Sequence, residues 1–457
     1  MRFVNREDEL AVLEDWWTSP SERVALVWGR RRVGKTALLQ RFAQDRRVVF
    51  HTAGGRAVPA ELQALSRAAA AALNGSGRDV ASRPFRDWDD ALETLFAEAA
   101  RDPLLLVFDE FPELVRVSPE VPSVLRALLD RTPPGRLKLL LCGSAVRTME
   151  AIQEERAPLY GRIDRSVLLH PFAPHECAAL LGSLKPADLA LVWGLVGGVP
   201  LYLQWWDQDA TVRANLQRLV CRPDGRLLTE GQLVLATEGE TGELARLVLQ
   251  AIASGRTRHH EIADAVRADP TRTLERLLRL RLVDRVVPVT EDPRRTRRRI
   301  YRVADNFLAF WLGVVDRYRG EIERGLGPTI LPVLMGHLDE HMGPRWEEAY
   351  RVHLRRMAAG GRLGDGVVAV GPFWREGSEA GEIDAVVLAG RRREAVLVGE
   401  ANWARSLDAR RILRRLQADL ALLPDVSDDP RLSVCARERV TSAGDDVLVV
   451  TAADVFG

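Results

Sequence analysis

The chain has 457 residues, of which 46% are apolar and 28% are charged, as is typical of globular proteins. This length exceeds one ordinary hydrophobic core, so we expect about three domains. The formal net charge is +1, which excludes a chain that is basic throughout and gives no sign of nucleic-acid binding at the level of the whole chain.

Two absences predict where the protein works. No apolar run is long enough to cross a bilayer, and the first ten residues lack the basic start and apolar stretch of a signal peptide. The cysteines lie far apart and form no CxxC pair: Cys142, Cys177, Cys221 and Cys435. We therefore expect a cytoplasmic protein without membrane contacts, whose thiols are reduced and mostly buried.

The first 173 residues alternate short apolar runs with amphipathic segments. The apolar runs predict buried parallel strands at 24–28, 48–50, 104–109, 137–143 and 166–172. The segments between them predict crossover helices at 36–46, 60–73, 86–100 and 121–131. This alternation is typical of a layered α/β domain.

A phosphate-binding loop follows the first of these strands. The segment GRRRVGKT matches G-x-x-x-x-G-K-[ST] and lies between a buried strand and a helix, the context that this motif requires. Its backbone N–H groups and the helix N-terminus suit phosphate oxygens. We expect nucleotide contacts from Gly29, Arg30, Arg31, Arg32, Val33, Gly34, Lys35 and Thr36. Lys35 should reach the β- and γ-phosphates, and the Thr36 hydroxyl should bind Mg²⁺.

Acids at the end of strand 104–109 complete this site. A buried strand has no packing reason to end in two acids, so we expect Asp109 to hold Mg²⁺ and Glu110 to polarise the attacking water. Ser144 follows strand 137–143. The chain resembles P-loop proteins with such an acid pair, in which this strand lies between the phosphate-loop strand and the acid strand. There Ser144 would sense the γ-phosphate or orient water; a plain turn serine is the alternative.

Behind this core the chain changes character. Residues 174–242 predict a helical lid with one break at GGVP, and GLGPTIL around 324–330 predicts a linker. The remaining residues, 331–457, predict a second α/β domain. Its elements are a helix at 343–358 and strands at 367–371, 382–389, 395–400 and 446–451.

Residues 243–323 predict a winged helix-turn-helix. Three short helical patterns precede a strand, a basic turn and another strand. Between residues 255 and 302, fourteen arginines stand against seven acids. One face of the third helix should carry Arg272, Arg276 and Arg279, and the turn carries Arg294, Arg295, Arg297, Arg298 and Arg299. Such a stripe suits DNA phosphates; the alternative is a clamp between domains that pairs with acids elsewhere in the chain.

Six segments in order resemble the archaeal-type ATPase family, AAA-related P-loop proteins close to the STAND signalling ATPases. They are FVNREDEL, GRRRVGKT, LLLVFDE, CGSA, PLYGRID and GGVPLYL, and the resemblance covers most of residues 1–320. It implies an AAA/ASCE-type sheet and roles for further residues. Asn5, Arg6 and Glu7 would lie near the adenine pocket, Arg162 would be an arginine finger or sensor, and Pro200 would place the lid over the nucleotide. A solvated loop arginine and a simple helix break are the alternatives for the last two.

The C-terminal region resembles the PD-(D/E)xK nuclease-like domain, which is similar to restriction endonucleases in fold. The resemblance implies that Glu347, Asp384 and Glu400 would hold a second divalent metal. The family usually has lysine at the position of Asn402, and no lysine occurs after Lys185. Arginine cannot replace it as a base, so cleavage is in doubt, and a metal-binding, nucleic-acid-binding or structural domain is the alternative.

These patterns together predict four domains: an ATPase core at 1–173, the lid at 174–242, the winged helix at 243–323 and the nuclease-like domain at 331–457. The predicted function is Mg-dependent ATP hydrolysis by a nucleotide-controlled switch that binds DNA through the winged helix. If the protein forms a homo-oligomer, Arg162 would act in trans on the nucleotide of another copy; otherwise it would act in cis. The alternatives are an ATP-bound scaffold that recruits a protein partner with little turnover, and an ATP-gated nuclease.

Overall fold

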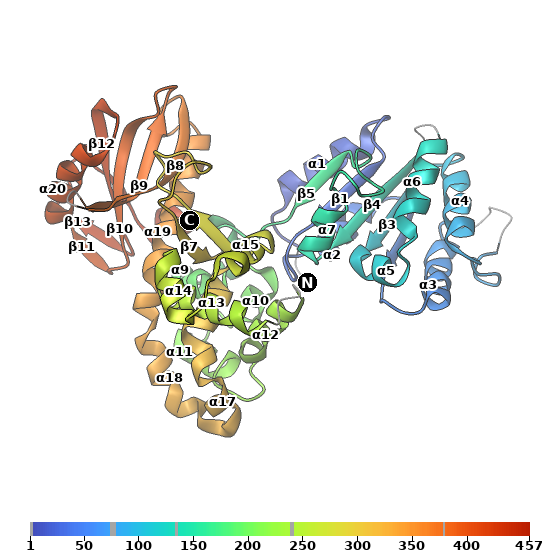
Figure 1. Cartoon of the computed structure of the whole chain (residues 1–457), viewed down its shortest axis with the longest axis horizontal. Coiled ribbons are helices and arrows are strands. Elements are labelled where there is room, and N and C mark those ends of the chain that lie inside the picture. The colour runs from blue at the N-terminus through green and yellow to red at the C-terminus, as the bar shows by residue number, and fades with distance from the viewer. Residues whose placement is uncertain (1–2, 74–78, 133–135, 238–241, 378–379) are drawn as a thin grey trace. The chain divides into compact units, whose positions relative to one another are not determined.

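The computed structural model describes residues 3–73, 79–132, 136–237, 242–377 and 380–457. The chain divides into two compact units, Met1–His170 and Pro171–Gly457 (Figure 1). The first corresponds to the predicted ATPase core. The second contains the segments predicted as lid, winged helix and nuclease-like domain, and their separation into three domains stays a prediction.

The first unit is built on a five-stranded parallel sheet in the order β2-β3-β4-β1-β5. Its strands are β1 (Val24–Trp28), β2 (Val48–Thr52), β3 (Leu104–Asp109), β4 (Leu137–Gly143) and β5 (Arg165–Leu168). β4 therefore lies between the phosphate-loop strand and the acid strand, as the sequence predicts. All residues of β1, β3 and β4 are buried, which explains their uninterrupted apolar runs.

Helices cover both faces of this sheet. They are α1 (Glu7–Thr18), α2 (Lys35–Ala43), α3 (Val58–Ala70), α4 (Trp88–Ala99), α5 (Phe111–Val117), α6 (Val121–Arg131) and α7 (Val146–Ala151). Successive strand residues point to opposite faces: Val24 and Leu26 join the core under α3 to α6, whereas Ala25 and Val27 join the core under α1 and α2. Two apolar layers thus hold the carboxyl ends of β1, β3 and β4 at one edge.

The second unit begins with helices. They are α8 (Ala178–Leu181), α9 (Pro186–Val196), α10 (Pro200–Trp205), α11 (Val212–Leu219), α12 (Arg226–Thr237), α13 (Glu243–Ala253), α14 (His259–Val266) and α15 (Thr271–Arg279). An antiparallel pair follows, β6 (Val283–Val286) with β7 (Ile300–Val303). The break at GGVP is confirmed, because α9 ends at Val196 and Pro200 begins α10. The helices and strands predicted for the winged helix are present, while that fold assignment stays a prediction.

The predicted linker at 324–330 is wrong. Short helical turns lead from α16 (Asn306–Phe310) to α17 (Arg319–Glu321), and α18 spans Gly327–Gly336. Gly325 departs from helical geometry with φ 94°. The helix forms because Ile330, Leu331 and Leu334 are buried, and because Pro328 suits a first turn, where its missing N–H has no helical partner. Tertiary burial overrides the glycine and proline signals.

A second five-stranded sheet ends the chain, in the order β14-β12-β10-β9-β8. Its elements, with the helices and short strands around it, are α19 (Leu338–Ala359), β8 (Val367–Arg375), β9 (Gly381–Ala389), β10 (Glu394–Asn402), β11 (Ser406–Asp408), α20 (Ala409–Asp419), β12 (Val426–Ala436), β13 (Arg439–Thr441), β14 (Leu448–Val450) and α21 (Ala452–Phe456). β8, β9 and β10 are antiparallel neighbours, and β12 runs parallel to β10.

The strand β12 escapes sequence reasoning because acids and Pro430 interrupt its first half. The register between β10 and β12 shifts in this half, where a proline is tolerated. α19 packs on the sheet through Tyr350, whose hydroxyl donates to Ser433 Oγ at 2.6 Å. Gly399 makes this approach feasible, since a Cβ there would lie 2.0 Å from the Tyr350 hydroxyl.

The four cysteines are buried free thiols, as predicted. Across the described ranges, no single helix has the length and apolar character to cross a membrane. The segments Pro174–Leu181 and Pro186–Val196 reach that length and composition only when counted together across a 107° bend.

Candidate nucleotide site and the acids of the C-terminal sheet

The phosphate loop turns sharply between β1 and α2. Gly29, Arg32 and Gly34 have φ values of 147°, 70° and 96°, and Gly34 caps the N-terminus of α2. At Gly29 a side chain is also excluded by space, because a Cβ would lie 2.4 Å from the Leu169 carbonyl oxygen. The loop can therefore bend its backbone toward the start of α2, where N–H groups without helical partners favour an anion.

Lys35 closes over this loop. Its side chain is buried, and Nζ donates to the carbonyl oxygens of Gly29 at 3.0 Å and Arg30 at 2.9 Å. A lysine ammonium carries three donors and one positive charge, so carbonyl contacts hold it at the loop while leaving it suited to a phosphate. The structure thus places Lys35 where the sequence motif predicts.

The acid pair lies beside the same loop. Asp109 ends β3 and is buried; its Oδ2 accepts a 2.9 Å hydrogen bond from Thr36 Oγ1. Its other oxygen, Oδ1, accepts from the Glu110 backbone N–H at 3.1 Å. A hydroxyl and a carboxylate side by side are the hard oxygen ligands that Mg²⁺ prefers, so these two residues fit that ion.

Glu110 and Ser144 meet at the edge of this site. Glu110 has left-handed backbone angles, φ 52° and ψ 45°, at the start of α5. Its Oε2 accepts a 2.9 Å hydrogen bond from Ser144 Oγ, and Ser144 follows β4 and is buried. Residues far apart in sequence therefore come together: Lys35, Thr36, Asp109, Glu110 and Ser144 form one cluster at the carboxyl edge of the sheet.

Two residues near the cluster have contacts that sequence reasoning missed. Arg6 is buried, and its Nη2 donates to the carbonyl oxygens of Val33 at 3.1 Å and His170 at 2.7 Å, so it fastens the segment before α1 to the phosphate loop. Cys142 lies on β4; burial raises the pKa of its thiol well above the usual range, and the Asp109 carboxylate raises it further. The position of Cys142 on the strand between the loop and acid strands is the signal that could have found it.

Comparisons with known proteins agree with this geometry. Residues 3–205 match the family described as an ATPase domain predominantly from Archaea. They are an archaeal-type ATPase domain. Residues 311–412 match a second family, described as archaeal and bacterial proteins of unknown function. The Walker-type ATPase of Pyrococcus abyssi has the same fold, with a TM-score of 0.52 and 22% identity over 68% of this chain and 96% of that one.

Two relatives come from Methanocaldococcus jannaschii. An uncharacterized protein is 25% identical over 426 residues, which cover 91% of this chain and 91% of the relative. An uncharacterized ATP-binding protein is 41% identical over 46 residues, which cover 10% of this chain and 78% of the relative. The first alignment includes residues of both compact units of this chain, since it covers 91% of its length.

Arg162 lies away from the cluster of the ATPase domain. It comes just before β5, whose start pairs beside Ala25, near the beginning of β1. The phosphate loop follows the other end of β1, and a five-residue strand spans about 17 Å. The Arg162 guanidinium pairs with Asp130 through two 2.8 Å contacts. A contact between Arg162 and the nucleotide of its own chain does not fit this position, because the length of β1 separates the arginine from the phosphate loop.

The remaining predicted nucleotide residues are placed only in part. Asn5, with φ 57°, precedes Arg6 and so lies in the segment that Arg6 fastens to the phosphate loop. Pro200 is buried at the start of α10, and the neighbouring Gly198 carbonyl accepts from the Phe172 N–H at 2.7 Å. These contacts anchor the helical region internally; a role of Pro200 in covering nucleotide stays a prediction.

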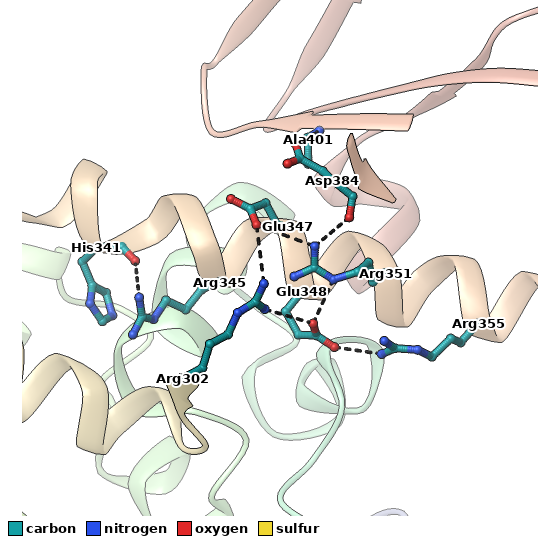
Figure 2. Close-up of polar contacts among 9 residues, drawn as sticks. All are labelled: Arg302, His341, Arg345, Glu347, Glu348, Arg351, Arg355, Asp384 and Ala401. Carbon is teal, nitrogen blue, oxygen red and sulfur yellow. Dashed lines mark hydrogen bonds and ion pairs between the residues drawn. The ribbon is translucent and has the colours of Figure 1, made fainter. Parts of the chain in front are cut away.

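The three acids predicted to hold the second metal also come together. Glu347 lies on α19, Asp384 on β9 and Glu400 on β10. Figure 2 shows the Glu347 carboxylate and the backbone carbonyl oxygen of Asp384 directed toward the buried Arg351, while the Asp384 carboxylate accepts a 2.8 Å hydrogen bond from the Ala401 backbone N–H. Burial, followed by the charges of Glu347 and Glu400, raises the pKa of Asp384 to about 8. The predicted convergence is therefore present.

Arginines occupy this acid trio. Arg351 Nη1 lies 3.6 Å from Glu347 Oε2 and donates to the Asp384 carbonyl oxygen at 2.7 Å. Arg415 pairs with Glu400. In the part of the chain that the structure describes, no group of three or more His, Cys, Asp or Glu side chains is arranged to hold a metal ion. The predicted second metal does not fit, because guanidinium groups already neutralise two of the three carboxylates.

The position of the usual lysine is equally unsuited to cleavage. Asn402 is exposed, and its Oδ1 accepts a 2.9 Å hydrogen bond from the Ala404 backbone N–H. Arg405, the nearest basic alternative in sequence, pairs with Glu438 at 2.8 Å. Neither side chain is arranged to activate water beside the acid trio.

Proposed function

We propose that this protein binds and hydrolyses ATP with Mg²⁺ and that the nucleotide state controls the second unit. The hydrogen bond from Thr36 to the buried Asp109, beside Lys35, carries the proposal, because it joins the two predicted Mg²⁺ ligands at the phosphate loop. When bound, Mg²⁺ neutralises phosphate charge. Thr36 and Asp109 would hold the ion, while Lys35 would bind the β- and γ-phosphates.

Glu110 would orient and polarise the attacking water. Its carboxylate accepts the Ser144 hydroxyl, and a hydroxyl has only one hydrogen to donate. A γ-phosphate that took this hydrogen would release Glu110 toward water, and loss of the phosphate would restore the contact seen here. Ser144 can thereby link the presence of the γ-phosphate to the state of the base, which is the local event that a nucleotide switch requires.

The Glu110→Gln variant tests hydrolysis. The amide keeps the shape but cannot accept a proton from water, so phosphate release should fall by about 10²- to 10⁴-fold while ATP affinity is retained. Lys35→Ala should lose ATP affinity. The matched control for Glu110→Gln is Glu113→Gln, which makes the same change one turn further along, on the exposed side of α5. If Glu110→Gln turns over like the unchanged protein, the alternative of a scaffold with little turnover is favoured.

Arg162 would act in trans. Its position at the edge of the sheet opposite the phosphate loop suits contact with the nucleotide of a second copy rather than with its own. We expect Arg162→Ala to reduce ATP turnover by about 10³-fold in an assembled protein without changing ATP affinity. Mixing this variant with the inactive Lys35→Ala protein should restore part of the activity if the arginine acts between copies, and no recovery would exclude that role.

Contact with DNA is the second part of the proposal. Arg272, Arg276 and Arg279 are exposed on α15, and Arg294 and Arg297 are exposed in the turn between β6 and β7. Exposed guanidinium groups on one helix face and a nearby turn suit a phosphate backbone. A short DNA duplex should therefore bind with strong salt dependence.

A further inference from the structure

The loop between β6 and β7 carries five arginines within the six residues 294–299. This arginine loop, residues 287–299, contains five arginines and two acids. The acids pair within the loop, Glu291 with Arg298 at 2.6 Å and Asp292 with Arg295 at 3.6 Å. Arg294, Arg297 and Arg299 are exposed. The loop thus keeps an excess of positive charge on its surface.

The base of this loop is docked on the C-terminal sheet. Val289 donates its backbone N–H to the Pro372 carbonyl oxygen at 2.8 Å, and Arg393 donates to the Val289 carbonyl oxygen at 2.8 Å. The Val289 side chain packs on the apolar core of this sheet, and a Cβ on Gly371 would lie 3.0 Å from it. Because β8 is an edge strand, the loop covers backbone groups that would otherwise face solvent (Figure 1).

Two arginines outside the loop pair with acids of the same domain. Arg302 on β7 lies 3.5 Å from Glu348 and 4.0 Å from Glu347, both on α19, as Figure 2 shows. Arg258, at the start of α14, pairs with Glu376 just after β8 at 3.1 Å. An acid of the nuclease-like trio, Glu347, therefore faces Arg302 as well as Arg351.

We propose that the arginine loop and the exposed face of α15 form an interface for double-stranded nucleic acid, and that the C-terminal α/β domain positions this loop instead of cleaving the bound strand. The inference rests on the proposed DNA contact and adds the role of the domain behind it. Arg302 pairs with Glu347 of the acid trio, and Val289 donates its backbone N–H to the edge strand β8. The domain thereby fixes the base of the loop while its arginine tip faces solvent.

The chemistry favours nucleic acid over an acidic protein surface. A guanidinium fork matches the two free oxygens of a phosphate, and phosphates repeat at regular spacing along a duplex. Arg272, Arg276 and Arg279 recur along one helix face, and the loop adds further exposed arginines. Repeated arginines in a helix and a turn suit a long, evenly charged polymer.

Binding of a short fluorescent DNA duplex at several salt concentrations tests the interface. Replacing Arg294, Arg297 and Arg299 by Ser should weaken binding about tenfold or more, and the slope of log affinity against log salt should fall by about 0.9 for each phosphate that an arginine no longer neutralises. Arg272→Ser, Arg276→Ser and Arg279→Ser should act in the same way. Polyglutamate of similar length serves as competitor; displacement of the duplex at equal charge concentration would overturn the nucleic-acid assignment.

Variants that remove negative charge test whether the domain positions the loop, because positioning and electrostatics predict opposite changes in DNA affinity. Glu376→Gln and Glu348→Gln each make the chain more positive, so electrostatics alone predicts tighter binding of the duplex. If the domain positions the loop, both variants bind several-fold more weakly. Glu340→Gln, an exposed acid on α19 outside this network, makes the same charge change and should not weaken binding.

The outcomes separate the two levels of the proposal. A chain that hydrolyses ATP but does not bind the duplex overturns the interface and leaves the ATPase intact. A second outcome is that removal of the arginines weakens duplex binding, while Glu376→Gln tightens it as the Glu340→Gln control does. This outcome overturns only the positioning of the loop by the C-terminal domain. Thermal unfolding of each variant separates loss of fold from loss of position, and the Glu376→Gln change, being on the surface, should leave the melting temperature unchanged.

Discussion

The protein contains two groups of converging acids, and their partners differ in kind. At the phosphate loop, Asp109 and Glu110 accept hydrogen bonds from the hydroxyls of Thr36 and Ser144. In the C-terminal sheet, Glu347 and Glu400 face the guanidinium groups of Arg351 and Arg415. Hydroxyls leave a carboxylate its full charge for a metal, whereas guanidinium groups neutralise it. Converging acids alone therefore do not identify a metal site. The charge of their hydrogen-bonding partners decides whether the carboxylates can bind a metal ion.

The largest expected effect contrasts Asp109→Asn with Asp384→Asn. Loss of a magnesium-binding carboxylate removes several kcal/mol of transition-state stabilisation, so Asp109→Asn should lower ATP turnover by about a thousandfold. Asp384→Asn should leave turnover within about twofold, because its carboxyl has no proposed part in ATP chemistry. Steady-state phosphate release measures both, and equal losses would break the contrast between the two acid groups.

The second effect concerns the arginine at the centre of the acid trio. Arg351 is fully buried, so Arg351→Ala should destabilise the protein by about 3–5 kcal/mol, as expected when one partner of a buried ion pair is removed. Arg355→Ala is the matched control: it lies on the same helix and pairs with Glu348 at 2.8 Å, but its side chain is 46% exposed, and it should cost less than about 1 kcal/mol. Urea unfolding would show the difference, and similar losses would contradict the buried network.

The smallest expected effect is a pH dependence from Asp384. Its pKa is raised from 3.8 to about 8, first by burial and then by the charges of Glu347 and Glu400. Because the folded state holds this proton more tightly than the unfolded state, the stabilisation is complete below pH 3.8 and is lost as pH rises through about 8. The melting temperature should therefore fall between pH 6 and pH 9 by a few degrees, at roughly 2–4 °C per kcal/mol.

The Asp384→Asn variant sharpens this comparison, because an amide does not titrate between those pH values. Its melting temperature should depend less on pH and should exceed that of the unchanged protein at pH 9. A variant that follows the same pH curve as the parent would show that another group controls this dependence.

The sequence by itself determined the nucleotide site because its parts are local. A phosphate loop needs a particular spacing of glycines, lysine and threonine, and buried strands are recognisable in the sequence as apolar runs. The meeting of Thr36 with Asp109 then follows from parallel strands that end at one edge. The place of β4 between β1 and β3 was expected from P-loop proteins with a similar acid pair. The convergence of Glu347, Asp384 and Glu400 was predicted only through the resemblance to the nuclease-like domain, because Glu347 lies on a helix and β9 and β10 are antiparallel.

Only the tertiary structure decided what surrounds these residues. The pairing of Arg302 with an acid of α19, the docking of Val289 on β8 and the position of Arg162 at the far edge of the sheet depend on contacts between distant segments. The helix at 327–336 likewise forms because burial outweighs glycine and proline signals. Local patterns encode backbone geometry and chemistry, but the partner of a charge is set by packing, which no short segment contains.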